Sequence, residues 1–155
     1  AWDISTASFN QSLSVSAYES NPQGIFFKPD GTKMYIAGAQ VDEVNEFTLS
    51  TAWDISTASF VQNFNVSSQE GSPSGICFSS DGTIMLISGS GADAISEFKL
   101  TTAWDISTAS YVRNFKTISI LGENTPQDVR YNDDGSKMYV VGTATDTVIE
   151  VDLVL

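Results

Sequence analysis

A repeat of 51 residues runs through the chain and constrains its fold more than any other feature. The octapeptide AWDISTAS occupies residues 1–8 and recurs unchanged at 52–59 and 103–110. The segments downstream also correspond: GIFFKPDGTKMYIAG at 24–38, GICFSSDGTIMLISG at 75–89 and DVRYNDDGSKMYVVG at 128–142. A period of this length indicates a repeat architecture, in which each unit buries its apolar surface against copies of itself.

Each repeat contains four short runs of β-forming residues, which we name a to d, and no helical periodicity. In the first full repeat they are GIFF, KMYIA, VNEFTL and FVQNFNV, and the octapeptide lies between c and d. An Asp-Gly pair separates a from b and supplies the positive φ that a tight hairpin needs. Four antiparallel strands in about 50 residues predict one blade of a β-propeller. The three blades are expected at about residues 24–66, 75–117 and 128–154.

The pattern PxGIxFxxDGTKMYIxG, followed by DxVxEFxL, resembles the repeats of the YVTN and NHL-like propeller families. The resemblance covers the full chain and implies an all-β propeller with three four-stranded blades per chain. It says almost nothing about function, because such propellers include enzymes, adhesins and scaffolds. The octapeptide departs from the family pattern and is similar to repeats of phage and marine-environment sequences that have no assigned role.

The order of the runs predicts how the blades complete one another. Residues 9–15 (FNQSLSV) form a d run with no a, b or c before them, and the third repeat ends after run c. Three blades cannot close a ring, because propellers use about 4–8 blades, whereas two chains supply six. We therefore expect a six-bladed ring formed by a C2 homodimer, in which each N-terminal strand completes the partner's last blade. The alternative is a piece of a longer six-bladed chain, which should also dimerise.

The composition argues against several classes of function. There are 19 Asp and Glu against 7 Lys and Arg, a formal net charge of −12, so neither nucleic acid nor a membrane is an expected partner. Histidine is absent, which removes the commonest general base and the commonest zinc ligand. Cys77 takes the place of Phe26 of the first repeat, so we expect a buried apolar residue rather than a reactive thiol. The acidic balance and the many Ser and Thr residues fit an extracellular or virion-associated protein.

The octapeptide has two interpretations. Its tryptophans, Trp2, Trp53 and Trp104, could stack on sugar rings, or each could cover the interface between neighbouring blades, where a large aromatic side chain buries most area. The aspartate that follows each tryptophan precedes a Ser and a Thr, and is placed to hold a turn through side-chain bonds to the backbone.

Six carboxylates at corresponding positions are candidates for a metal site. Glu19, Glu70 and Glu123 belong to the d–a loops, and Asp42, Asp93 and Asp146 belong to the b–c loops, which share one face of a propeller. Hard cations prefer several carboxylate oxygens, so this face is a candidate Ca²⁺ site; no other cofactor is expected. The alternative is turn chemistry and solubility, because Asp is favoured in such hairpins. A wide ring would also hold the carboxylates too far apart to share one ion.

Two further charged positions depart from the pattern of a simple strand. Run c contains a glutamate at its middle in each repeat, Glu46, Glu97 and Glu150, where both faces of a blade are covered. We therefore expect partly buried carboxylates that bond a backbone or hydroxyl group of the next blade, rather than catalytic groups. Arg130 replaces Phe26 and Cys77 in run a; it either faces the channel or pairs with a carboxylate at the chain junction.

Three functions fit the sequence. The first is a non-enzymatic scaffold or recognition module. The second is an enzyme that resembles the gluconolactonase-type six-bladed propellers, whose channel metal is held by Glu, Asn and Asp; it would need different residues on different blades, whereas these blades are nearly identical. The third is a carbohydrate-binding lectin. We expect the first, with a small molecule or a carbohydrate as ligand.

Overall fold

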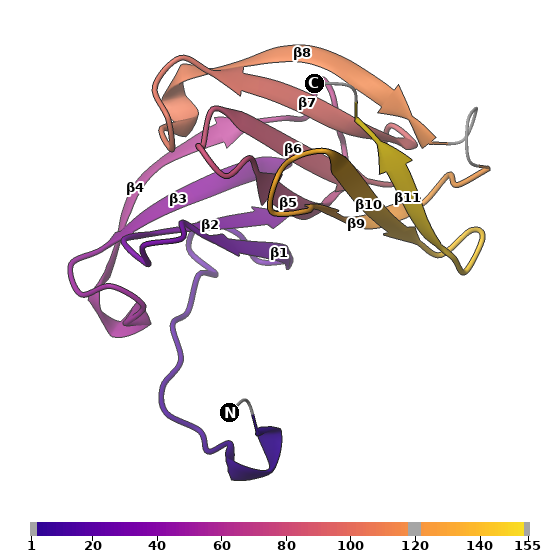
Figure 1. The fold of residues 1–155 in the computed structure, drawn as a ribbon. Coiled ribbons are helices and arrows are strands. Elements are labelled where there is room, and N and C mark those ends of the chain that lie inside the picture. Colours follow the sequence, from indigo (N-terminus) through magenta and orange to yellow (C-terminus); the bar gives the residue numbers. More distant parts are fainter. Residues whose placement is uncertain (1–2, 118–121, 154–155) are drawn as a thin grey trace.

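A computed structural model of the chain describes residues 3–117 and 122–153. Within them, eleven strands form three antiparallel sheets that fan out side by side, two of four strands and one of three (Figure 1). Blade 1 is formed by β1 (Pro22–Phe27), β2 (Lys33–Gly38), β3 (Glu43–Leu49) and β4 (Ala58–Asn65). Blade 2 is formed by β5 (Pro73–Phe78), β6 (Ile84–Gly89), β7 (Ala94–Leu100) and β8 (Ala109–Lys116). Blade 3 is formed by β9 (Pro126–Tyr131), β10 (Lys137–Gly142) and β11 (Val148–Asp152).

The strands follow the order predicted from the repeat. In each blade the neighbours along the sheet are neighbours in sequence, and the first strands of the three blades lie next to one another. The all-β propeller fold is therefore confirmed. Each inner strand begins at its proline, two residues before the start expected from the repeat, because Pro22 and Pro73 still pair with Gly38 and Gly89 across a bulge.

Alternate residues of each strand point to opposite neighbours, as the pleat of a β-strand requires. In β2, Tyr35 and Ala37 belong to the core shared with blade 2, whereas Met34 and Ile36 face away from it. Blade 2 shares a second core with blade 3, to which Cys77 contributes a buried thiol. Burial raises the pKa of that thiol, which fits an apolar role rather than a reactive one.

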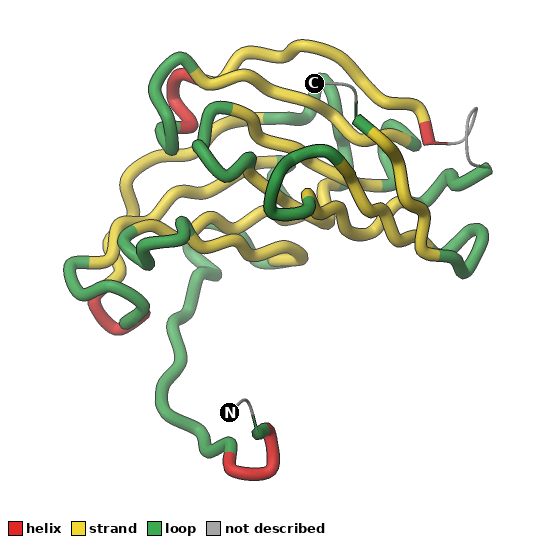
Figure 2. The backbone as a smooth tube through the Cα atoms, in the orientation of Figure 1, coloured by secondary structure: helices red, strands yellow, loops and turns green. Residues whose placement is uncertain are grey.

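The N-terminal arm, residues 3–15, leaves blade 1 and extends away from the sheets (Figure 1). It holds a short 3₁₀ helix, η1 (Ile4–Thr6), and no strand between residues 9 and 15 (Figure 2). Ile4 and Phe9 are 91% and 84% exposed. Leu13 and Val15 pack on the outward face of blade 1, against the cluster that contains Met34. The exchange of this segment between two chains stays a prediction.

The a–b hairpins turn at the Asp-Gly pairs. Gly31, Gly82 and Gly135 have φ values of 72–73°, in the left-handed region that favours glycine. A Cβ atom on Gly31 or Gly82 would also collide with the indole of Trp53 or Trp104. Among the described residues, no helix is long and apolar enough to cross a membrane.

Replacing Gly82 by alanine tests this packing, with Gly122→Ala as the matched control. Both glycines have a φ of 73°, but a Cβ on Gly122 would meet only a Thr145 methyl group, at 3.9 Å. Both variants should lose about 1–2 kcal/mol to the left-handed conformation. Gly82→Ala should lose about 1–3 kcal/mol more, because Trp104 has to move. Equal losses in urea unfolding would show that the indole contact contributes nothing.

Candidate functional site

The three d–a loop glutamates are buried and bonded to backbone N–H groups. Oε1 of Glu70 accepts hydrogen bonds from the backbone N–H of Ser72 at 2.9 Å and of Gly91 at 2.6 Å, and Oε2 accepts one from Ala92 at 3.1 Å. Glu19 and Glu123 make the corresponding bonds to their own loops. Each carboxylate therefore ties its d–a loop to the b–c loop of the same blade.

Glu123 has the fullest set of donors. Burial disfavours its charge, but hydrogen bonds from the backbone and hydroxyl groups of Thr125 and Thr145 outweigh that effect and lower its pKa from 4.5 to about 2. Glu19 has the poorest set, since its buried Oε2 has no hydrogen-bond partner.

The b–c loop aspartates have a conformational role. Asp42, Asp93 and Asp146 have φ values of 53–55°, which Asp tolerates better than most residues. Within residues 3–117 and 122–153, no three Asp, Glu or Cys side chains come close enough together to hold a metal ion. The six candidate carboxylates lie on the d–a and b–c loops, and a cation site on them stays a prediction.

From its aspartate onward, the octapeptide folds in the same way at all three positions. Asp54 caps η2 (Ile55–Thr57), because its carboxylate accepts bonds from the backbone N–H of Ser56 at 3.0 Å and from its hydroxyl at 2.7 Å. These bonds, together with one from Gln11, lower the pKa of Asp54. Asp105 caps η3 (Ile106–Thr108) and Asp3 caps η1 by the same contacts.

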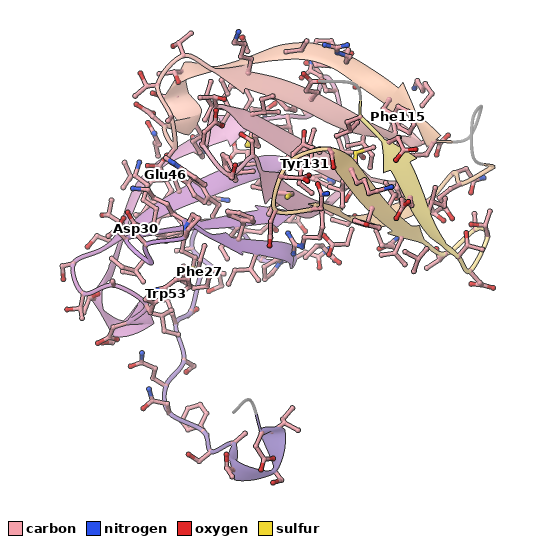
Figure 3. The ribbon with its side chains drawn as sticks, viewed as in Figure 1. Phe27, Asp30, Glu46, Trp53, Phe115 and Tyr131 are labelled. Atoms are coloured by element: carbon pink, nitrogen blue, oxygen red, sulfur yellow. The ribbon has the colours of Figure 1, made fainter. Side chains whose placement is uncertain are left out.

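One tryptophan of the octapeptides, Trp104, covers the interface between blades 1 and 2. Trp104 has a φ of 65°, and its ring contacts Phe78 of its own blade and Phe26 of blade 1. Its carbonyl oxygen accepts bonds from Lys33 Nζ and the Tyr35 hydroxyl, both at 2.7 Å. Trp53 lies beside Phe27 (Figure 3) and is 58% exposed, since no described blade lies beyond it. Trp2 lies outside the described residues.

A buried polar cluster at the interface of blades 1 and 2 is the feature that sequence reasoning missed. Glu46, only 1% exposed, accepts bonds from Lys33 Nζ at 2.6 Å and Gln62 Nε2 at 2.9 Å. Gln62 also donates to Asp105 at 2.8 Å, and the Ile106 N–H donates to Glu46 at 3.3 Å. The sequence predicted a backbone or hydroxyl group of the next blade as the partner of Glu46, and the Ile106 N–H is such a group. It did not predict Lys33 and Gln62, which belong to the same blade as Glu46.

The two other run-c glutamates are more open. The side chain of Glu97 is 26% exposed and pairs with Arg113 at 3.1 Å. Glu150 is 52% exposed and pairs with Lys137 at 2.6 Å. Arg130 donates to the Ile76 carbonyl oxygen at 2.7 Å and lies 3.5 Å from Asp128, so it bridges blade 3 to blade 2.

Comparison with protein families matches residues 3–153 to the family described as "Lactonase, 7-bladed beta-propeller". The chain belongs to this family. The described residues form three blades of the seven that the family's description names. A comparison with curated proteins finds no match.

Several solved propellers share the fold. A provisional 6-phosphogluconolactonase of Bacteroides fragilis is 18% identical, with a TM-score of 0.65 over 84% of this chain and 34% of its own. Hydrazine synthase of Kuenenia stuttgartiensis is 17% identical, with a TM-score of 0.64 over 94% of this chain and 36% of its own. A Lactobacillus plantarum protein is 18% identical, with a TM-score of 0.65 over 86% of this chain and 38% of its own. The chain spans a little over a third of the length of these proteins, and such identities show the fold alone.

Acid titration should reveal the contribution of Glu123. Its folded pKa, about 2, lies below the ordinary value of 4.5, so its stabilising effect is complete above pH 4.5 and is lost as the pH falls toward 2. Glu123→Gln should be less stable by about 1–3 kcal/mol at pH 7, because the amide places a donor against backbone N–H groups.

The measurement is urea unfolding of both proteins at pH 7, 4 and 3, at one protein concentration. The wild type should lose more stability on acidification than Glu123→Gln, since all other carboxylates are common to both. Identical acid profiles would contradict the assignment.

Proposed function

We propose that the chain is a non-enzymatic β-propeller module, a scaffold or recognition unit, that completes a ring with a second copy of itself. This ring has six blades, one fewer than the family's description names. The observation that carries the proposal is the state of the loop carboxylates. Glu19, Glu70 and Glu123 are at most 1% exposed and accept backbone hydrogen bonds, so they hold loops together instead of offering oxygens to a cation or a substrate.

The two end blades support the assembly. On the outward side of blade 1, Leu13, Ile25, Met34 and Ile36 line an apolar cavity of about 290 Å³. On blade 3, Val141 and Val148 are 42% and 73% exposed. A propeller blade normally has a neighbour on each face, and exposed strand edges favour pairing with another chain. Two copies placed end to end would cover all four outward faces.

The alternative function, a metal-dependent lactonase-like hydrolase, is favoured by the family to which the chain belongs. It would require carboxylate and amide oxygens that converge on the channel. The blades instead carry the same groups at corresponding positions, each bonded within its own blade. A small molecule or a carbohydrate remains the ligand class that we propose for a recognition role.

The enzymatic alternative is tested by incubating the full chain with a sugar δ-lactone, with and without added Ca²⁺. We expect the rate of ring opening to equal that of the heat-denatured chain, because among the described residues no three carboxylates come close enough together to hold a metal ion. Ca²⁺-dependent turnover that is lost in Glu70→Gln, but kept in Glu43→Gln, would overturn the non-enzymatic proposal.

The assembly is tested separately by light scattering at micromolar concentration. The expected mass is twice that of the 16.7 kDa chain. Deletion of residues 1–16 should abolish the soluble dimer, because it exposes the edge of blade 3 and the outward face of blade 1 together. A well-folded monomer from the full chain would contradict the six-bladed ring.

A further inference from the structure

The interface between blades 1 and 2 is covered by an octapeptide, and the interface between blades 2 and 3 has no octapeptide over it among the described residues. At the first interface, the octapeptide of blade 2 places Trp104 over Gly82 and buries Ile106 completely. The corresponding octapeptide of blade 3 would follow β11, where the described residues end at Leu153. A cavity of about 470 Å³ lies there instead.

The cavity lining matches the first interface residue by residue. Glu97 and Arg113 stand where Glu46 and Gln62 stand one repeat earlier, and Tyr131 stands where Phe78 contacts Trp104. Tyr131 and Phe115, both labelled in Figure 3, line this cavity. A Cβ atom on Gly135 would meet nothing within 4 Å, whereas the corresponding glycines lie under an indole. The cavity is therefore the place that an octapeptide would fill if blade 3 were covered as blade 2 is.

The chain also carries a third octapeptide that has no blade beneath it. In the arm, the carboxylate of Asp3 accepts bonds from the backbone N–H of Ser5 at 2.9 Å and from its hydroxyl at 2.7 Å, as Asp105 does from Ser107. Ile4, the counterpart of the buried Ile106, is 91% exposed. The 3₁₀ turn that follows Asp3 is thus formed before any partner covers it.

The arm is held on the side of its own chain that is remote from the cavity. Gln11 Nε2 donates to Asp54 at 2.8 Å, which repeats the bond of the same length between Gln62 and Asp105. The arm also packs on the face of blade 1 that points away from blade 2. Residues 9–15 therefore occupy the place of the outer strand of a blade that precedes blade 1, and in a closed ring that blade is blade 3 of another copy.

We propose that residues 3–8 of a second copy of this chain bind in the cavity between blades 2 and 3. This inference rests on the proposed homodimer and names its contact. Asp3 of one copy pairs with Arg113 of the other, where Asp105 accepts from Gln62 at the first interface, and the N–H of Ile4 donates to Glu97.

The same placement completes the outer edge of blade 3. Residues 9–15 of the second copy pair with β11, so that Gln11 lies opposite Glu150 as Gln62 lies opposite Glu46. Gln62 donates both to its strand neighbour Glu46 and to Asp105. Gln11 already makes the second of these bonds and gains the first at the junction. Because the dimer is twofold, both junctions form together.

Charge reversal tests the pairing in full-length chains. Asp3→Lys and Arg113→Glu each put like charges at both junctions, so each variant alone should dimerise at least about 100-fold more weakly than the wild type, about tenfold for each junction. An equimolar mixture of the two should form dimers again, since one junction then pairs Asp3 with Arg113 and the other pairs Lys with Glu. The control is Lys116→Glu, which makes the same charge change in β8 but at a side chain that bonds the Ala92 carbonyl oxygen.

The charge-reversal experiment distinguishes failure of the octapeptide contact from failure of the dimer itself. Light scattering of the single variants and of the mixture gives the result, and circular dichroism checks that the blades stay folded; Asp3→Lys changes only the exposed arm. A wild-type dimer that both variants leave intact, or a mixture that stays monomeric, would overturn the contact and leave the dimeric scaffold standing. A monomeric wild type would overturn both.

Discussion

Every blade of this protein has two faces that must be covered, because successive side chains of a strand point to opposite sides. In β2, Tyr35 points toward blade 2, and Met34 points the other way. A half-covered blade leaves a row of apolar side chains in water, at about 25 cal/mol for each Å². The interfaces between blades therefore contain the main cores, the buried Glu46 cluster and the octapeptide.

Local chemistry explains why most of the fold could be predicted from the sequence. Asp-Gly pairs fix the a–b hairpins, and the runs between them are too short and too regularly spaced for helices. The strand starts at Pro22 and Pro73 were placed two residues late, because a bulge lets the proline rejoin the sheet after an unpaired residue. A bulge leaves no clear mark in a hydrophobic pattern.

The candidate site was less predictable because its contacts cross from blade to blade. The repeat identified Glu19, Glu70 and Glu123 as corresponding carboxylates, but not their burial, which depends on how closely the d–a and b–c loops approach. Gln11, Gln62 and Arg113 also correspond in sequence, and this alignment was the available signal for the polar cluster. The sequence alone could not show that these side chains form a cluster, because Gln62 and the Asp105 that it contacts are 43 positions apart.

The identity of the three octapeptides has a consequence for synthesis on the ribosome. Residues 1–8 emerge before the segment at 103–110, which has the same sequence and closes the interface of blades 1 and 2. Until that segment emerges, the early copy is a competitor for its place. The segment at 103–110 is favoured at this interface, because closing the short loop after β7 costs less conformational entropy than folding residues 1–8 back from the N-terminus. The short connection between β7 and residues 103–110 thus ensures that the correct octapeptide binds. A longer connection would reduce its advantage over residues 1–8.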